Sequence, residues 1–239
     1  MTRQRGVEGM APAAVSAVAA LEDRLRRSMF EFIRRQRRPV TRDQAADEVG
    51  ISRKLAAFHL DKLVDAGLLT VTAAAEPRRV GRAPKAYTAS ETDVRVSIPD
   101  RQHDVLATIL LDAVLTHTPD ETATEAALRV ARQSGIASGR QGRAGLGGSR
   151  LGPERALTAS EPMLIQHGYE PERVSPLCIR LRSCPFHPLN TRAPDLVCGM
   201  NHALLAGFVT GLDTPAIEAV LHPEPGECCV ELQATRRPV

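Results

Sequence analysis

Residues 41–72 read TRDQAADEVGISRKLAAFHLDKLVDAGLLTVT, and this stretch decides the fold of the first third of the chain. Thr41 and Ser52 are good helix N-caps, because a side-chain hydroxyl accepts a hydrogen bond from a backbone N–H that the first helical turn leaves unpaired. Gly50 and Gly67 follow at the distance of a short helix, and glycine is common just past a helix C-terminus. The pattern therefore predicts two helices joined by a tight turn, over residues 42–48 and 53–66.

Strand and helix patterns lie on either side of this pair. Residues 68–72 form a β-like run, the loop 76–82 is polar, and residues 85–88 fit a returning strand. Upstream, apolar residues recur at helical spacing over 16–36, with an arginine-rich opposite face. Residues 1–14 are expected to form a loose tail. The predicted order is helix, helix, turn, helix and hairpin.

The charge of the chain is unevenly distributed. Residues 1–90 hold 17 Arg and Lys against 10 Asp and Glu, whereas residues 91–239 hold 14 against 18. A basic first third joined to an acidic remainder indicates that only the first third meets a polyanion. The 25% charged and 43% hydrophobic fractions of the whole chain argue against wholesale disorder.

The residues that define the N-terminal arrangement are Thr41, Val49, Gly50, Ile51, Ser52, His59, Leu60, Leu63, Ala66, Gly67, Leu68 and Leu69. Their combined spacing within residues 20–90 resembles the winged helix-turn-helix of ArsR-type bacterial regulators. The segment 80–87, VGRAPKAY, looks like the wing of that group, in which Gly-Arg-Pro-x-Lys-x-Tyr is common; here Ala83-Pro84 inverts the usual order. The resemblance implies a winged helix-turn-helix DNA-binding domain over residues 16–90.

Two parts of such a domain touch DNA, the second helix of the turn and the wing. The N-terminal residues of that helix meet base edges, where Arg53 can present a bidentate fork to guanine and Lys54 can meet phosphate. The candidate DNA-contacting residues are Thr41, Ser52, Arg53, Lys54, Ala57, Phe58, Arg78, Arg79, Arg82 and Lys85. We assign His59 to packing or to a side-chain hydrogen bond. Because such regulators usually bind pseudo-palindromic double-stranded DNA as two-fold dimers, the resemblance implies a homodimer.

Residues 91–239 predict a second domain. Helices are expected at 100–117, 121–135, 153–167 and 197–212, and strands at 177–181 and 229–232. The glycine-rich stretch 135–152 is expected to be a flexible loop or linker. Helices mixed with a few antiparallel strands give an α+β domain, so the fold class predicted for the chain is α+β, with sensing and dimerisation in this second domain.

All five cysteines lie in the last 62 residues. Because five is odd and the setting looks cytosolic, a disulfide framework is not expected. Cys178 falls inside an apolar strand and is expected to be a buried small hydrophobe. The others, Cys184, Cys198, Cys228 and Cys229, lie near predicted strand and helix ends, where loops can aim ligand side chains inward. A helix N-terminus lowers a thiol pKa, which favours Cys198 as a metal ligand.

The spacing of these four cysteines matches neither the paired cysteines of a zinc ribbon nor the closely spaced cysteines of a ferredoxin. A winged helix followed by Cys184-Pro185-Phe186, then by Cys198 and by Cys228-Cys229, resembles the repressors of iron–sulfur-cluster-assembly (Suf) operons. The resemblance implies a 4Fe–4S or 2Fe–2S cluster whose presence sets DNA affinity. Its ligands would be Cys184, Cys198 and either Cys228 or Cys229.

The sequence alone does not identify all the ligands of the predicted cluster. Adjacent residues of a strand point to opposite faces, so only one of Cys228 and Cys229 is expected to ligate. The candidates for the fourth ligand are the second of these cysteines, His187, His202 and an external small molecule.

Two alternatives stay open beside this hypothesis. Four thiolates would also suit Zn²⁺ as a structural ion, with a small hydrophobic effector bound in the second domain. Cys184 and His187, spaced i and i+3, could act as nucleophile and base of a thiol enzyme, but no oxyanion-hole glycine pattern is visible in the sequence. We therefore expect a regulator and not an enzyme.

No apolar run reaches the roughly 18–20 residues that span a bilayer. The run 11–21 loosely mimics a secretory signal, but Pro12 and Ser16 interrupt it and the charged segment 22–27 follows at once. We expect a cytoplasmic protein with no membrane partner.

Overall fold

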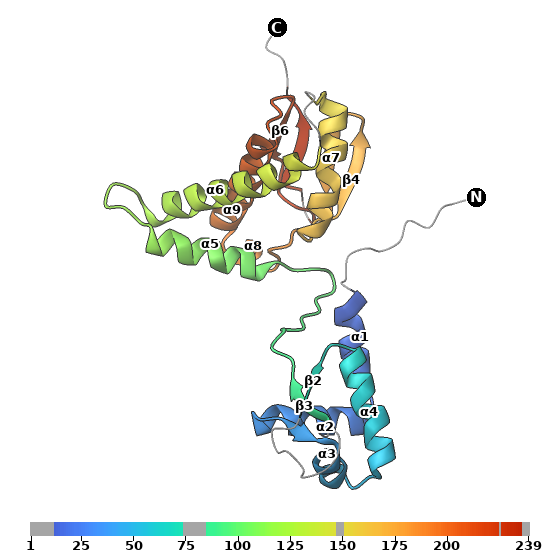
Figure 1. Cartoon of the computed structure of the whole chain (residues 1–239). Coiled ribbons are helices and arrows are strands. Elements are labelled where there is room, and N and C mark those ends of the chain that lie inside the picture. The colour runs from blue at the N-terminus through green and yellow to red at the C-terminus, as the bar shows by residue number, and fades with distance from the viewer. Residues whose placement is uncertain (1–11, 74–84, 147–150, 225, 236–239) are drawn as a thin grey trace, which may run out of the picture. The chain divides into compact units, whose positions relative to one another are not determined.

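A computed structural model of the chain describes residues 12–73, 85–146, 151–224 and 226–235. The chain forms two compact units, Met1–Val96 and Ser97–Val239, each with its own hydrophobic core (Figure 1). This division falls a few residues after the predicted boundary at residue 90. Helices and antiparallel strands occur in both units, so the fold class is α+β, as predicted.

The first unit combines helices with a small antiparallel sheet. Its helices are α1 (Pro12–Ala20), α2 (Arg24–Gln36), α3 (Arg42–Val49) and α4 (Arg53–Asp65). Its strands are β1 (Val40–Thr41), β2 (Leu69–Ala73) and β3 (Lys85–Ala89), paired in the order β1-β3-β2. The two predicted turn helices and the two strands of the hairpin are confirmed to within one residue at each end.

The single helix predicted over 16–36 is wrong, because the chain forms α1 and α2 with a turn between them. Asp23 accepts a hydrogen bond from the Arg26 backbone N–H at 2.9 Å and so caps α2. The Arg26 guanidinium also donates to the Ala20 carbonyl, which the end of α1 leaves without a helical partner. A short carboxylate that bonds the backbone locally competes with helix continuation, and hydrophobic spacing alone does not reveal this competition.

Apolar side chains from α2, α4 and the sheet form the first core. Its largest fully buried members are Met29, Ile33, Leu60, Leu63, Leu69 and Tyr87. The Tyr87 hydroxyl accepts a hydrogen bond from Arg42 Nη2 at 3.2 Å, which ties the first residue of α3 to the sheet. The core thus buries one face of α4 and leaves the opposite face in solvent.

The second unit holds helices and a four-stranded antiparallel sheet (Figure 1). Its helices are α5 (His103–Leu115), α6 (Ala123–Ala144), α7 (Pro153–Gln166), α8 (Leu189–Arg192) and α9 (Pro194–Gly211). Its strands are β4 (Pro171–Ser175), β5 (Cys178–Leu181), β6 (Ile217–Leu221) and β7 (Val230–Ala234). The sheet order is β4-β5-β7-β6. Helices α5 and α6 form a hairpin, and α6 lies along α9 (Figure 1).

The flexible loop expected over 135–152 is wrong in its first part, because α6 continues to Ala144. The glycines of this part face α9: a Cβ at Gly135 would lie 1.9 Å from the Leu204 carbonyl oxygen. The same closeness, at 2.1–2.2 Å, holds for Gly139, Gly207 and Gly211. These glycines let two helices pack backbone to backbone, and this packing overrides the low helix propensity of glycine.

The sequence pattern missed β4, β6 and the short α8. Strands β4 and β6 are the two edges of the sheet. No residue of strand β4 (PERVS) is fully buried. Its sequence therefore lacks the alternation of apolar and polar residues that predicts a half-buried strand. Strand β7 begins at Val230, one residue later than predicted, and Cys228 and Cys229 therefore precede the strand.

Candidate nucleic-acid interface and cysteine site

Side-chain caps fix the turn between α3 and α4. Thr41 and Gln44 form a reciprocal capping box at the start of α3, with N···O distances of 3.3 and 2.9 Å. Gly50 ends α3 at φ +68°, a left-handed conformation that glycine adopts without steric cost. Ser52 then accepts a hydrogen bond from the Leu55 N–H and starts α4. Both caps lie where the sequence predicted them.

Most of the predicted DNA-contacting residues that the structure describes are in solvent. Exposed are Ser52, Arg53, Lys54, Phe58 and Lys85, and half-buried are Thr41 and Ala57. Arg78, Arg79 and Arg82 of the predicted wing lie outside the described residues. Exposed cationic side chains in the first turn of α4 are in the position from which a recognition helix reaches base edges.

Arg53 is held by a carboxylate of the preceding helix. Its Nε lies 3.0 Å from Asp43 Oδ1, and both side chains are largely exposed. An exposed ion pair contributes little stability. Arg53 can therefore exchange Asp43 for the O6 and N7 atoms of guanine at small energetic cost.

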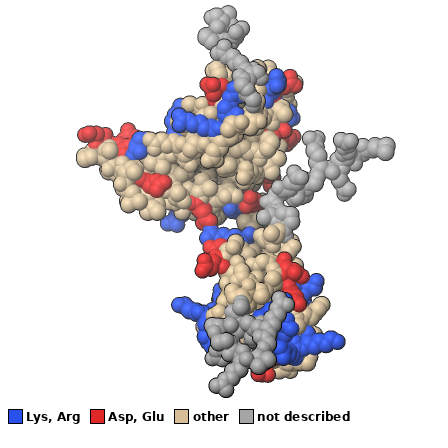
Figure 2. Space-filling view, in the orientation of Figure 1, with Lys and Arg blue, Asp and Glu red and all other residues tan. Residues whose placement is uncertain are grey.

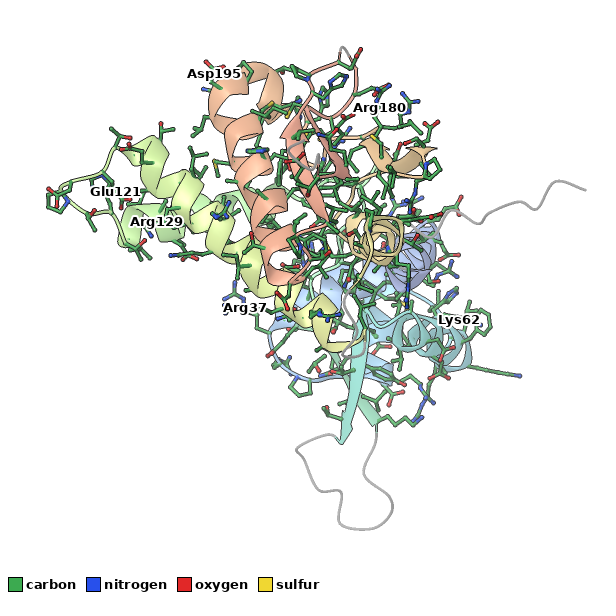
Figure 3. The ribbon with its side chains drawn as sticks, turned by 90° about the horizontal axis from the view of Figure 1, so that it is seen from above. Arg37, Lys62, Glu121, Arg129, Arg180 and Asp195 are labelled. Atoms are coloured by element: carbon green, nitrogen blue, oxygen red, sulfur yellow. The ribbon has the colours of Figure 1, made fainter. Side chains whose placement is uncertain are left out.

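Leu55 and Lys62 lie on the same exposed face of α4 as Phe58, but the sequence pattern did not identify them as candidate DNA-contacting residues. Lys62 Nζ lies 6.0 Å from the centre of the Phe58 ring, a cation–π distance. Figure 3 shows Lys62 on this helix. The i, i+4 spacing from Phe58 places both side chains on one face and is the signal that could have identified Lys62.

A second basic surface lies at the C-terminal end of α2. Arg34, Arg37 and Arg38 line a hollow of about 650 Å³ together with Thr70 and Thr88 of the sheet. Figure 2 shows Lys and Arg side chains standing out on both sides of this unit. Guanidinium groups beside the β2–β3 hairpin can meet the phosphate backbone of a bound duplex.

His59 is buried, as its assignment to packing predicted. Its ring meets the Phe58 ring edge-on at 5.5 Å, and its Nδ1 lies 4.0 Å from Asp23 Oδ1. His59 of α4 thus lies near the turn between α1 and α2, and its Nδ1 has no hydrogen-bond partner among the described residues.

The four cysteines predicted as ligands come together in the second unit, and we call them the cysteine site. A thiol hydrogen bond joins Cys184 to Cys228, another joins Cys228 to Cys229, and a third joins Cys229 to Cys198. All four are free thiols; Cys198 is half-buried and the other three are buried. The fold therefore brings together sulfurs that are up to 45 residues apart in the chain.

Three separate parts of the fold carry the cysteine site. Cys184 lies in the turn between β5 and α8, Cys198 in α9, and Cys228 and Cys229 in a bend before β7. The Cys228 N–H donates to the Leu181 carbonyl at 3.0 Å, which pins the bend to the end of β5. Because the bend is not a pleated strand, the argument that only one of this pair faces the site does not hold. Both thiols contact another cysteine.

The direction expected for the pKa of Cys198 is wrong. Burial raises the pKa of Cys198 to about 12, and its hydrogen bond to Cys229 adds to the rise. Cys198 lies beyond the first turn of α9, where the helix dipole acts weakly. Hydrogen bonds from Cys228 and then Cys198 instead lower the pKa of Cys229 to about 6. The Cys228 thiol likewise lowers the pKa of Cys184.

Two buried polar residues that sequence reasoning missed adjoin the cysteine site. Asn201 Nδ2 lies 3.1 Å from Cys228 Sγ, and the Tyr169 hydroxyl donates to Asn201 Oδ1. Burial raises the pKa of Tyr169, so its hydroxyl stays protonated and remains a donor. Asn201 follows Cys198 by three residues in α9, and this helical spacing is the signal that could have identified it.

The two histidines considered as a fourth ligand have other surroundings. His187 is exposed, and His202 Nε2 lies 3.0 Å from the Ala219 carbonyl oxygen of β6. Cys178, expected to be buried, is half-buried in β5. Within the part of the chain that the structure describes, no three His, Cys, Asp or Glu side chains are arranged to hold a metal ion. The thiols of the cysteine site form a hydrogen-bonded row, whereas metal ligands are deprotonated and surround the ion.

A family model described as a helix-turn-helix domain matches residues 21–72, from the residue after α1 to β2. A search of curated proteins found no match to the chain. Among the described helices, none is both long and apolar enough to cross a membrane. Since the matched segment contains the capped pair α3 and α4 and runs into the β2–β3 hairpin, the chain carries a winged helix-turn-helix domain and is a DNA-binding transcription regulator.

Proposed function

We propose that this regulator is a repressor like those of Suf operons, in which the cysteine site holds an iron–sulfur cluster that sets operator affinity. The observation that carries the proposal is the convergence of Cys184, Cys198, Cys228 and Cys229 from three separate parts of the fold. Core packing needs small apolar groups at such positions. It does not need four thiols that bond one another.

The donor type supports this proposal, although the four thiols would have to leave their hydrogen-bonded row to surround a cluster. Cysteine thiolates are the usual ligands of iron–sulfur clusters. The half-buried Cys198 leaves the site reachable, while the other three sulfurs are shielded. When bound, the cluster would supply one-electron redox chemistry at this position. The chain supplies Cys184 and Cys229 as the thiols that lose a proton most readily, and an amide donor, Asn201, beside Cys228.

The second unit connects the cysteine site to an exposed helix. If Cys198, Cys228 and Cys229 held a metal as thiolates, their thiol–thiol hydrogen bonds would be lost, and the spacing between α9 and the bend before β7 would change. Because α6 and α9 touch through their glycine backbones, α6 moves with α9. Helix α5 forms a hairpin with α6 and receives the displacement.

The end of α5 supports the homodimer that a two-fold operator requires. Leu110, Leu111, Val114 and Leu115 are exposed there, with Val114 at 76% and Leu115 at 73%. A contiguous apolar surface on a folded protein marks an interaction site. Such a surface is complementary to its own copy, as the contact of a two-fold dimer must be. The partner proposed for α5 is a second copy of this chain.

Anaerobic purification tests the proposed cluster. Visible absorbance, iron, acid-labile sulfide and zinc would be measured in the wild type and in a Cys184→Ser/Cys198→Ser variant, with Cys178→Ser as the matched control. We expect a broad band near roughly 400–420 nm with stoichiometric sulfide in the wild type and the control, and its loss in the double variant.

DNA affinity completes this test. Binding sites would be selected from random-sequence duplexes, and the cluster-loaded and cluster-free forms compared by titration. A cluster whose presence sets operator affinity should give the two forms different affinities. If the double variant kept both the metal content and the operator affinity of the wild type, the mechanism would be wrong.

A second candidate keeps the regulator and makes the cysteine site a structural zinc site, with an effector bound elsewhere. A surface hollow of about 480 Å³ bordered by α6, α9 and β6 favours this candidate. Its lining includes Thr214, a buried residue whose Oγ1 has no hydrogen-bond partner among the described residues. Four thiolates suit Zn²⁺ by donor type. A colourless preparation with about one zinc per chain would favour this candidate.

A further inference from the structure

Asn201 is fully buried beside the cysteine site, and hydrogen bonds hold both ends of its carboxamide. Its Nδ2 lies 3.1 Å from Cys228 Sγ, and a further hydrogen bond joins it to Cys229. Its Oδ1 accepts the Tyr169 hydroxyl. Because a hydroxyl donor occupies Oδ1, the amide N–H groups face the sulfurs.

Packing does not explain an amide at this place. The inward-facing neighbours of Asn201 in α9 are apolar, with Val197, Met200 and Leu204 all buried. Burying a carboxamide costs free energy unless its donors and acceptor are paired. A leucine would fill the space at no such cost. The feature that sets Asn201 apart from a leucine is the N–H that it directs at Cys228.

We propose that Asn201 is a positioning residue for Cys228: oriented by Tyr169, it donates an N–H to the Cys228 sulfur and supports that sulfur as a thiolate ligand of the bound metal. This inference rests on the proposed metal-binding role of the cysteine site. A hydrogen bond to an ionised acceptor is stronger than one to a neutral acceptor, so the contact strengthens when Cys228 ligates. Asn201 and Cys198 lie one helical turn apart, so α9 supplies one ligand and orients another.

Two measurable effects follow from this hydrogen bond. Outer-shell partners of metal ligands typically contribute about 10- to 100-fold to metal affinity, and Asn201 would do so for any metal held by Cys228. Hydrogen bonds to cluster sulfurs also set the reduction potential. Since the N–H stabilises the added negative charge of the reduced state, its removal should shift the midpoint potential to a more negative value.

The first experiment titrates the full chain, reduced and metal-free, with Co²⁺ alone, and follows thiolate-to-cobalt absorbance. Asn201→Leu should bind Co²⁺ about 10- to 100-fold more weakly than the wild type, and Asn201→Gln, which keeps the amide, should recover part of the affinity. Tyr169→Phe keeps the ring but removes the orienting O–H, and should weaken binding in the same direction. The matched control is Ser160→Ala, which removes another buried hydroxyl, bonded to the Ala156 carbonyl at 2.9 Å, and should bind Co²⁺ like the wild type.

The second experiment measures the midpoint potential of the iron–sulfur-loaded protein, which should be more negative in Asn201→Leu. Equal Co²⁺ affinities in the wild type, Asn201→Leu and Tyr169→Phe would overturn the inference. If these variants bind Co²⁺ more weakly but no iron–sulfur cluster forms in the wild type, the proposed cluster is wrong and the role of Asn201 stands. Absence of thiolate-to-cobalt absorbance in the wild type would overturn both. Should Asn201→Leu fail to fold, as judged by circular dichroism, Tyr169→Phe and Asn201→Gln decide instead.

Discussion

Arg53, a predicted DNA-contacting residue, forms an exposed ion pair with Asp43. Arg53 leaves the first turn of α4 directly after its Ser52 cap, and Asp43 of α3 holds its Nε at 3.0 Å. Because both side chains are exposed, the ion pair contributes little stability, and the guanidinium can leave Asp43 for another partner.

Replacing Arg53 by Ala should weaken binding to a selected DNA site by about 1–3 kcal/mol and relax the base preference at one position, because a bidentate base contact is lost. Fluorescence anisotropy with the selected duplex and its single-base variants measures both effects. Asp43→Ala, the paired control, removes only the intramolecular ion pair and should keep the base preference. An Arg53→Ala protein with an unaltered preference would exclude Arg53 from base readout.

Glu121 gives a pH dependence of known sign. The Arg129 guanidinium, hydrogen-bonded to Glu121 beside the α5–α6 hairpin (Figure 3), lowers the pKa of Glu121 to about 2. A folded-state pKa below the unfolded value means that the stabilisation is fully present above about pH 4.5 and is lost as the pH falls towards 2. Glu121→Gln should therefore lose less stability than the wild type as the pH falls from about 5 to about 2.

Urea unfolding at a series of pH values measures this difference. The exposed Glu154→Gln serves as the control variant and should follow the wild type. If Glu121→Gln followed the wild type as well, the ion pair would be absent in solution.

At the residue scale, the sequence identified the cysteines as candidate metal ligands. It missed side chains whose role depends on the neighbours that the fold places beside them. Cys184 and Cys198 could be singled out because thiols near strand and helix ends are candidate ligands. Asn201 and Tyr169 could not, since only the fold places an amide beside Cys228 and a hydroxyl behind it. The same reason explains the wrong expectation for the pKa of Cys198, which burial and Cys229 determine.

At the scale of elements, local hydrogen bonds were predictable and tertiary packing was not. Helices α3 and α4 begin at Thr41 and Ser52, whose caps need only residues three positions away. The glycines of α6 were assigned to a loop, because glycine favours a helix interior only where a second backbone lies against it. That second backbone belongs to α9 and is distant in the sequence.

Gly135→Ala should destabilise the second unit by about 1–3 kcal/mol, because its Cβ would lie 1.9 Å from the Leu204 carbonyl oxygen and the two helices would have to separate. Gly142→Ala in the same helix is the matched control, since its Cβ would meet the Leu212 and Phe208 side chains at 3.5 and 3.9 Å, which are ordinary van der Waals distances. The control should be neutral or stabilise by up to about 1 kcal/mol through helix propensity. Thermal unfolding followed by circular dichroism compares the two; equal stabilities would contradict the close packing.

At the scale of the whole molecule, the charge division of the sequence anticipated a DNA-binding part and a separate second part. The exposed apolar end of α5 was not anticipated. The sequence shows that Leu110, Leu111 and Val114 form an apolar face of a predicted helix. Helical periodicity does not tell whether such a face packs inside its own unit or stays exposed to solvent, as it does here.

A Val114→Glu/Leu115→Glu variant should be monomeric where the wild type is dimeric, because charges on a self-complementary apolar contact repel their own copies. Sedimentation equilibrium measures the association, and DNA titration should show loss of affinity for a two-half-site duplex. Leu177→Glu, which charges an exposed leucine on another element, before β5, is the control and should remain dimeric. A double variant that sediments like the wild type would move the dimer contact away from α5.

The glycine contact between α6 and α9 also determines where the second unit is stiff. At an ordinary helix crossing, side chains separate the two backbones, and the packed helices can slide past each other by small amounts. Where the glycines of α6 and α9 meet there is no such layer of side chains, and any sliding has to displace backbone atoms already in contact. Helices α6 and α9 should therefore move together as one rigid body. A displacement imposed at Cys198 of α9 should therefore reach α6 without being absorbed at the crossing.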